Sequence, residues 1–370
     1  MQIIPAQNKN DLQAFIDLPY CLYKDDPNWV APLRNEQKNQ FIATKNPMLD
    51  HCHYQLFLLY KDNQVIGRIA AFIDQLALGA WKKPIGLFGS FECIDDPQAA
   101  QMLLDAARNW LRKQKMHRMR GPWSFASQEW GLVLKGFTPP PVILAPYNPP
   151  YYNEFLKSFG LKKVKDLMVY VIDAGNGYQV PERYLTLTDK IEKRFGVSVR
   201  PVNMHKLEED VITIMKIANQ SIADNWGFYP VTEAESRAMA HDLKQIVNPK
   251  AVLIAENKDG KPIGFAISLP DINLLIKDFK GNLLPLNWLK LMLGLKKINQ
   301  YRMWALGVIP EYQGKAIDTL LYKKTYEALY NPTVRVEINY VLEDNQRMNN
   351  ALMRLGVKPL RRYRVYEMSI

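Results

Sequence analysis

Cysteine is scarce in this chain of 370 residues: only Cys21, Cys52 and Cys93 are present, and they lie far apart in the sequence. Three widely spaced cysteines make neither the disulfide framework of a small secreted domain nor the paired spacing of a zinc cluster. His51 and His53 flank Cys52, but adjacent side chains on a strand point to opposite faces, so we expect no metal site there. Cysteine usage therefore favours the reducing cytoplasm.

Long apolar runs are also missing. No stretch of the chain reaches the roughly 18 consecutive apolar residues that a membrane-spanning helix needs. The N-terminal stretch, MQIIPAQNKNDLQAF, lacks a basic region followed by a long apolar core, so we read no signal peptide. Both absences agree with the cytoplasmic location that cysteine usage predicts.

Basic charge is abundant. The chain has 48 lysines and arginines against 37 aspartates and glutamates, a net charge of +11, and 48% of its residues are apolar. This composition is typical of a folded globular protein, and the length favours two domains. The positive surplus indicates anionic partners, such as phosphate-bearing ligands, nucleic acid or an anionic membrane. Because no Lys/Arg block is interleaved with stacking aromatic residues, we expect no dedicated nucleic-acid domain.

The sequence repeats itself at an offset of about 197 residues. The turn at 61–67, KDNQVIG, recurs at 258–264 as KDGKPIG, and in both copies an apolar strand precedes and follows it, which predicts a β-hairpin. Further on, FGLK at 159–162 is matched by LGVK at 355–358, and an alternating strand follows each. Two homologous halves explain these matches better than convergent turn chemistry.

Compensating insertions distinguish the halves. The central helix of the first half is expected to begin at Asp96-Pro97, an N-cap followed by proline at the first helical position. The central helix of the second half begins near Gly314. The second half therefore gains about twenty residues within 271–300, before its helix, and the first half gains about twenty within 121–150, after its own. The apolar stripe of the first helix is formed by Ala100, Leu103, Leu104, Ala107 and Leu111.

These patterns predict an α/β protein of mixed α+β type, with two tandem domains at about 1–175 and 190–370. A turn segment rich in glycine and asparagine, 173–177, joins them. Each half reads as strand, helical region, hairpin, strand, central helix, strand, helix and paired strands. That order favours a mixed central sheet flanked by helices in each domain.

Residues 306–329, LGVIPEYQGKAIDTLLYKKTYEAL, form the most informative stretch. An apolar strand ends at Pro310, a short polar turn follows at 311–315, and a helix then begins. A strand that leads into a Gly/Lys turn at a helix N-terminus presents unpaired backbone N–H groups, and the helix dipole favours negative charge there. The stretch therefore predicts a cup for a pyrophosphate. The apolar stripe of this helix is formed by Ile317, Leu320, Leu321 and Ala328.

This stretch resembles the acyl-CoA-binding motif of the GNAT (Gcn5-related N-acetyltransferase) acyltransferases, usually [Q/R]-x-x-G-x-[G/A] after the fourth strand. The pattern falls on 313–318, with Ala316 at the central glycine and Asp318 at the last small residue. Asp318 either places negative charge near the expected phosphates or serves the first turn of the helix. The resemblance implies two GNAT-like domains in tandem, with acetyl-CoA or another acyl-CoA as co-substrate and no metal.

The resemblance also implies a cofactor-binding set in the second half. Backbone N–H groups at 306–308 would contact the acyl carbonyl and the pantetheine arm, and 313–317 would cradle the pyrophosphate. Lys315 would add a positive charge or be a solvated turn residue, and Asn345 would lie near the pantetheine arm or cap the last helix. The set is Leu306, Gly307, Val308, Gln313, Gly314, Lys315, Ala316, Ile317 and Asn345.

Acid and base groups are harder to find. Direct transfer to an amine needs a base and a proton donor for the departing thiolate. The family often has a tyrosine seven residues after the asparagine, but that position is Leu352, which leaves Tyr363 or Tyr366 as a substitute candidate. Asp271, after the second hairpin strand, and Glu235, in a segment of aromatic residues and carboxylates, are candidate bases. Thr232 and Glu235 also have capping-box spacing, a structural alternative.

The first half is expected to bind CoA poorly. Asp95 and Asp96 stand where the phosphate cup would be, and Pro97 removes an N–H donor. Its expected part is to pack against the second half and to shape a cleft for the amine between the halves.

Segment 281–297, GNLLPLNWLKLMLGLKK, is apolar on most sides and flanked by lysines, yet too short to span a bilayer. It would cover the core, roof a pocket for a long acyl chain, or rest on an anionic membrane with Trp288 at the interface. The chain also resembles tandem GNAT-like bacterial enzymes thought to N-acylate sphingoid-type amines.

An acyl-CoA-dependent N-acyltransferase, acetyl or longer, is therefore the leading functional hypothesis. A non-catalytic acyl-CoA sensor is the main alternative, since Leu352, Ala316 and Asp318 depart from the family pattern. A long-chain amine N-acyltransferase at the membrane surface and an aminoacyl-tRNA-dependent transferase are the others. The expected partners are an acyl-CoA and a small or lipid-like amine, and the oligomeric state stays open.

Overall fold

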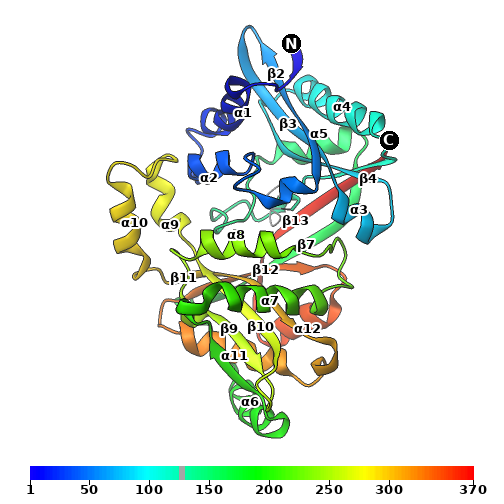
Figure 1. Cartoon of the computed structure of the whole chain (residues 1–370). Coiled ribbons are helices and arrows are strands. Elements are labelled where there is room, and N and C mark those ends of the chain that lie inside the picture. Colours follow the sequence, from blue (N-terminus) through cyan, green and yellow to red (C-terminus); the bar gives the residue numbers. More distant parts are fainter. Residues whose placement is uncertain (125–129) are drawn as a thin grey trace. The chain divides into compact units, whose positions relative to one another are not determined.

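A computed structural model describes residues 1–124 and 130–370, which form two compact units (Figure 1). Unit 1 consists of Met1–Asp166, Leu275–Trp288 and Arg361–Ile370. Unit 2 consists of Leu167–Leu274 and Leu289–Leu360. Both units combine a sheet with flanking helices, which confirms the predicted mixed α/β class.

The sheet of unit 1 has the strand order β1-β2-β3-β4-β5-β13, and β6 pairs with β13. Pairing is antiparallel except between β4 and β5. The elements are β1 (Gln2–Pro5), α1 (Lys9–Leu22), α2 (Arg34–Asn39), β2 (Cys52–Lys61), β3 (Gln64–Asp74), α3 (Gln75–Trp81), β4 (Ile85–Cys93), α4 (Pro97–Lys113), β5 (Arg118–Gly121), β6 (Leu132–Lys135), α5 (Tyr151–Ser158) and β13 (Lys358–Ser369), with a 3₁₀ turn at Pro47–Asp50.

Local sequence explains much of unit 1. Asp62 and Asn63 both have positive φ, at 49° and 61°, as the two-residue turn between β2 and β3 requires. The Asp96 side chain accepts hydrogen bonds from the N–H groups of Gln98 and Ala99, so the predicted N-cap of α4 is confirmed. The predicted stripe of α4 is fully buried in the main core of the unit, against β2 and β3.

The sheet of unit 2 has the order β7-β12-β11-β10-β9-β8, and only β11 and β12 run parallel. In Figure 1, α7 and α8 pass in front of its strands. The elements are β7 (Lys162–Asp173), α6 (Glu182–Phe195), β8 (Ser198–Pro201), α7 (Leu207–Ser221), α8 (Glu233–Leu243), β9 (Val252–Glu256), β10 (Pro262–Pro270), β11 (Gln300–Val308), α11 (Ile317–Leu329), β12 (Arg335–Leu342) and α12 (Gln346–Arg354), with 3₁₀ turns at Met204–Lys206, Pro249–Ala251 and Pro310–Tyr312.

Each sheet is completed by a strand from the other half of the sequence. The C-terminal strand β13 pairs with β5 and β6 of unit 1, with Tyr366 opposite Gly121. The matching strand of the first half, β7, pairs with β12 of unit 2, with Asp173 opposite Arg335. The compact units therefore differ from the sequence domains 1–175 and 190–370, which stay a prediction about the duplication.

The insertion between β10 and β11 forms α9 (Asn273–Ile276), a 3₁₀ turn (Lys277–Phe279) and α10 (Asn287–Leu295). Most large side chains of α10 and of the loop before it are exposed, so the segment does not simply cover a core. Among the described residues, no helix has the length and apolarity to cross a membrane.

Candidate active site in unit 2

Strands β11 and β12 separate at the start of the candidate site. Their parallel pairing runs from Gln300 opposite Arg335 to Met303 opposite Ile338 and ends there, although β11 continues to Val308. Over this last part β11 is paired with β10. One edge of residues 305–308 is therefore left without a neighbouring strand, and its backbone groups can pair with a ligand.

Beyond β11, the turn at 313–316 leads into an uncapped helix N-terminus. Gly314 and Ala316 have left-handed backbone conformations, with φ of 79° and 58°. The N-cap residue of α11, Ala316, has no side chain that could accept a hydrogen bond from the first turn. Within the described chain, the N–H groups of Gly314, Lys315 and Ala316 have no hydrogen-bond partner. These amides and the dipole of α11 together favour an anion.

Charged side chains beside the turn offset one another. The Asp318 carboxylate lies 3.6 Å from the Arg347 guanidinium, and it also accepts a hydrogen bond from the N–H of Thr319. The Lys315 ammonium lies 4.4 Å from the centre of the Tyr312 ring, a cation–π contact. Asp318 is therefore partly neutralised, while the turn amides keep their preference for negative charge.

A cavity of about 360 Å³ opens from this turn into unit 2. Its lining comes from the end of β11, the turn, α11, α12 and the sheet, and is mostly apolar. Residues that line it include Leu306, Gly307, Val308, Gln313, Gly314, Ile317, Asp318, Tyr322, Tyr326, Arg347, Met348, Leu352, Ile172, Tyr178, Met303, Leu329, Val334, Val336, Ile338 and Leu355.

The end of β11 is braced against α7. A Cβ atom on Gly307 would lie 2.2 Å from Ser221 Oγ, so only glycine permits this approach of the helix. The side-chain amide of Gln313 donates a hydrogen bond to the carbonyl oxygen of Val308, at 3.1 Å. Gln313 thus links the turn to the strand that precedes it, and both residues line the cavity.

Comparison with known proteins gives the family. No protein-family model matches this chain. Protein YghO of Escherichia coli K12 is 38% identical over 371 residues, covering 98% of this chain and 94% of that protein. The bacterial ceramide synthase of Caulobacter vibrioides is 34% identical over 385 residues, covering 100% of this chain and 98% of that protein. This chain belongs to their family.

Solved structures agree on the fold. A tandem GNAT protein from the clavulanic acid biosynthesis pathway, 12% identical, matches 100% of this chain and 98% of its own with a TM-score of 0.61. A GCN5-related N-acetyltransferase from Sphaerobacter thermophilus, also 12% identical, matches 99% and 95% with a TM-score of 0.54. The chain therefore has the tandem GNAT fold, as the motif at 313–318 predicted.

Unit 1 has the same GNAT sheet, but the end of its corresponding strand, β4, is occupied by a side chain. The register with the hairpin strand places Glu92 where unit 2 has Gly307. The Tyr152 hydroxyl accepts a hydrogen bond from the N–H of Cys93 at 2.8 Å and lies 3.1 Å from its carbonyl oxygen. Tyr152 thus occupies the strand edge that stays open on β11. Because Asp96 also caps α4, unit 1 lacks both the uncapped helix start and the open strand edge that unit 2 has among its described residues.

Most of the expected cofactor-binding residues converge on the cavity. The lining includes seven of them: Leu306, Gly307, Val308, Gln313, Gly314, Ile317 and Asn345. Ala316 contributes an unpaired amide beside it, whereas the Lys315 side chain turns to Tyr312. The Asn345 side chain accepts a hydrogen bond from the N–H of Met348, so the capping alternative is confirmed. Acyl-CoA binding by this set stays a prediction.

The candidate acid and bases do not line the cavity. Asp271 is buried, and it accepts hydrogen bonds from the Asn273 N–H and the Gln300 amide. Glu235 accepts a hydrogen bond from the Thr232 N–H, which confirms the capping box at the start of α8. Tyr363 lies on β13, in the part of the chain that belongs to unit 1. Each has a structural setting, and a catalytic role for any of them stays a prediction.

Sequence reasoning missed Tyr322 of α11. Its side chain lines the cavity, and its hydroxyl lies 3.1 Å from the sulfur of Met348 on α12. Burial, with a smaller effect from Asp318, raises the pKa of this phenol, so the hydroxyl stays protonated and able to donate. The only available signal was its place one position after the buried Leu320–Leu321 pair, which does not distinguish a cavity-facing residue from a core residue.

A cluster in unit 1 differs from expectation. His51, Cys52 and Asp74 place possible ligand atoms within 4.8 Å of one another, because His51 precedes β2 and is not bound by strand alternation. Asp74 Oδ1 accepts hydrogen bonds from the N–H groups of Leu76 and Ala77 and lies 3.0 Å from His51 Nδ1. The carboxylate therefore serves as the N-cap of α3. That no metal binds here stays a prediction.

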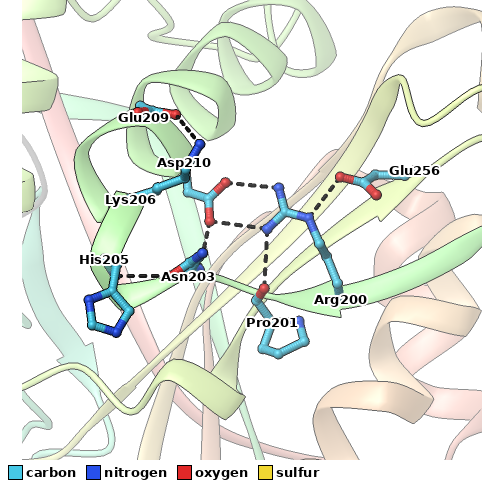
Figure 2. Close-up of polar contacts among 8 residues, drawn as sticks. All are labelled: Arg200, Pro201, Asn203, His205, Lys206, Glu209, Asp210 and Glu256. Atoms are coloured by element: carbon cyan, nitrogen blue, oxygen red, sulfur yellow. Dashed lines mark hydrogen bonds and ion pairs between the residues drawn. The ribbon is translucent and has the colours of Figure 1, made fainter.

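An ionic brace supports the helix that backs the site (Figure 2). Arg200 of β8 makes two hydrogen bonds to the Asp210 carboxylate on α7, at 2.8 and 3.0 Å, and a third to Glu256 on β9. Burial raises the pKa of Asp210, but the bonds from Arg200 and from the Asn203 N–H outweigh it, so this pKa is below its usual value. The brace fixes the start of α7 against two strands.

Proposed function

We propose that this protein is an acyl-CoA-dependent N-acyltransferase whose donor binds in the cavity of unit 2. The observation that carries the proposal is the set of unpaired amides at 314–316, which lie with the partnerless edge of β11 at 305–308 beside an apolar cavity. An acyl-CoA needs all three environments: unpaired amides for its pyrophosphate, a free strand edge for the amides of its pantetheine arm, and an apolar cavity for its acyl chain. A small polar ligand would use only the unpaired amides.

The turn amides and the N-terminus of α11 would bind the pyrophosphate, and Arg347 would offset the negative charge of Asp318 beside them. The free edge of β11 at Leu306–Val308 would pair with the amides of the pantetheine arm. Its N–H groups would also polarise the thioester carbonyl, where negative charge develops as the reaction proceeds. The co-substrate supplies the activated acyl group.

In the transfer step, the amine nitrogen attacks the thioester carbonyl carbon, so that a C–N bond forms and the C–S bond breaks. The amine loses a proton to a base or a water, and the thiolate takes one from a donor. We assign the donor role to Tyr322. Side chains on a helix point towards its N-terminus, so a tyrosine at Leu352 would reach the turn that contains Met348. The Tyr322 hydroxyl lies beside Met348 and so reaches that place from α11.

A longer acyl group and a lipid-like amine suit the cavity better than acetyl transfer to a polar amine. Its interior wall is formed by aliphatic and aromatic side chains such as Met303, Leu329 and Val336. The Caulobacter relative is named a ceramide synthase, and ceramides are N-acylated long-chain amines, so its name also supports a long acyl group and a lipid-like amine. The expectation of an amine cleft between the two halves stays a prediction.

Thiol release from acyl-CoA tests the proposal directly. Purified protein is incubated with acetyl-, octanoyl- or palmitoyl-CoA and with sphinganine or a short polar amine, and free CoA thiol is followed with a chromogenic reagent. We expect amine-dependent release that is fastest with palmitoyl-CoA and sphinganine. No release with any pair, together with no calorimetric binding of CoA or acyl-CoA, would refute both the activity and the binding site.

A non-catalytic acyl-CoA sensor is the second candidate, because Leu352 occupies the position of the usual family acid and is fully buried. The same experiment separates the two. Tight binding of acyl-CoA without thiol release across a broad amine panel would support the sensor. Any amine-dependent turnover would exclude it.

A further inference from the structure

Exposed hydrophobic side chains gather on one short part of the chain. Ten large hydrophobic residues are exposed among the described residues, and seven of these lie between 274 and 293. The most exposed are Leu284 at 74% and Leu293 at 72%. Such clustering differs from the scattered single residues that are normal on a protein surface. The seven are Leu274, Leu284, Leu286, Trp288, Leu289, Met292 and Leu293.

The outer side of α10 is apolar, the reverse of an ordinary surface helix. One face of the helix is formed by two pairs of residues, each pair spaced one turn apart: Trp288 with Met292, and Leu289 with Leu293. All four are exposed, whereas Leu291 on another side is buried. A surface helix normally buries its apolar stripe. Here the helix is anchored by a single buried leucine and presents its larger apolar face outwards.

Positive charge borders this face. From 273 to 300 the sequence contains five lysines and one acidic residue, Asp278. All five lysines, Lys277, Lys280, Lys290, Lys296 and Lys297, are exposed. Exposed leucines beside a tryptophan and flanked by lysines fit a lipid interface: the apolar groups enter the acyl boundary, and the lysines remain among anionic headgroups.

We propose that α10 and the loop before it, residues 284–297, form a docking surface for an anionic lipid bilayer. A second copy of this chain is a poorer occupant, because a two-fold interface would bring the same lysines of both copies together. The apolar face would lie at the headgroup boundary with Trp288 in the interfacial layer. Lys290, Lys296 and Lys297 would contact lipid phosphates.

Vesicle flotation of the full chain, without substrates, tests this surface independently of the proposed enzymatic activity. Vesicles contain phosphatidylglycerol with phosphatidylcholine, or phosphatidylcholine alone. We expect binding to the anionic vesicles that weakens as salt rises, and little binding to the neutral ones. The double variant L289E/L293E should bind about tenfold more weakly or worse, because two apolar side chains are replaced by anions. Tyr330→Glu, at an exposed aromatic residue outside the segment, is the matched control and should bind like the wild type.

A charge series separates specific from general electrostatic attraction. The variant K290Q/K296Q/K297Q should lose about fivefold in binding for each lysine removed. The control K61Q/K83Q/K113Q removes the same charge from three exposed lysines elsewhere and should bind like the wild type. Lipids with brominated acyl chains should quench the fluorescence of the wild type, and Trp288→Phe should remove most of that quenching.

Three results would overturn the proposal. Wild-type protein could fail to float with anionic vesicles at low salt. The segment variants and their controls, all with unchanged thermal melts, could bind equally well. Sedimentation could instead reveal a dimer of the wild type that L289E/L293E dissociates, which would assign the surface to a second copy of the chain.

Discussion

Single hydroxyl groups distinguish the two units at the residue scale. In unit 1 the Tyr152 hydroxyl bonds to the backbone of Cys93 and closes the strand edge. In unit 2 no tyrosine follows Asn345 at the usual spacing, and Tyr322 approaches from the facing helix. The two related sheets therefore differ in which helix supplies the tyrosine, and Tyr322, the proton donor that we propose, lines an apolar cavity.

Tyr322→Phe should lower kcat for acyl transfer by about 100-fold, because the thiolate would leave without a positioned proton donor. KM should change little, since the ring and its packing remain. Burial raises the pKa of Tyr322 above 10, so its ionisation should cause no loss of wild-type activity below pH 10. Steady-state thiol release across pH measures both effects. Tyr326→Phe, one turn later on the same helix, is the control, and full activity in Tyr322→Phe would exclude the donor role.

Asp210→Asn should lower the free energy of unfolding at neutral pH by about 1–3 kcal/mol, because the charged bonds to Arg200 are lost. The folded-state pKa of Asp210 lies below its ordinary value of 3.8. The stability it contributes is therefore present above about pH 4 and disappears as pH falls through the folded-state pKa. Urea melts should show a large loss of unfolding free energy in the variant at pH 7 and a small loss at pH 3. An equal loss at both pH values would contradict the stabilising role that we assign to the charged Asp210 carboxylate.

At the scale of elements, the two units differ at the N-termini of their central helices, α4 and α11. The first turn of α4 is capped by Asp96, whereas α11 follows the left-handed Ala316 and has no side-chain cap. The corresponding helix start in two related sheets is therefore either capped by a side chain or left with unpaired amides. Left-handed backbone at Gly314 and Ala316 holds the amides of the open turn in place.

Two substitutions in the turn should have opposite effects on stability. Ala316→Gly should raise the free energy of unfolding by up to about 1 kcal/mol, because alanine is strained at positive φ. Gly314→Ala should lower it by about 1 kcal/mol for the same reason and should also weaken CoA binding by distorting the amides. Thermal melts and calorimetric titration with CoA measure the pair. Changes of the same sign in both variants would show that turn conformation does not determine their effects.

Strand exchange dominates at the scale of the whole molecule. Unit 1 depends on β13, whose Glu367 bonds to Arg120 and whose Arg364 bonds to Asp166. Unit 2 depends on β7, whose Asp173 bonds to Arg335. Neither half of the sequence therefore contains all the strands of its own sheet, and the duplicated sequence folds as an interlinked pair.

Fragments 1–175 and 190–370 should each fail to fold stably when produced separately, because each would have one sheet edge unpaired and one strand without its partner. Circular dichroism should show no cooperative melt for either fragment, and both should aggregate. Co-expression should recover a soluble complex that melts cooperatively. A cooperative melt of either fragment alone would mean that the exchanged strand is dispensable.

Short-range patterns carried the reliable predictions from sequence. The turn at Asp62-Asn63, the Asp96 cap and the buried stripe of α4 follow from residues within a few positions of one another, where backbone sterics and helix periodicity decide the outcome. The motif at 313–318 likewise indicated the GNAT fold, since a glycine turn at a helix start is a local feature.

The features that the sequence did not predict depend on contacts between residues that are distant in the sequence. Nothing near Lys358 indicates that β13 pairs with β5, because strand partners are chosen by the register and burial of the complete sheet. Tyr322 could not be distinguished from a core tyrosine until α12 brought Met348 against it. The exposed apolar face of α10 was also hidden, since periodicity shows that a face is apolar but only tertiary packing decides whether another element covers it.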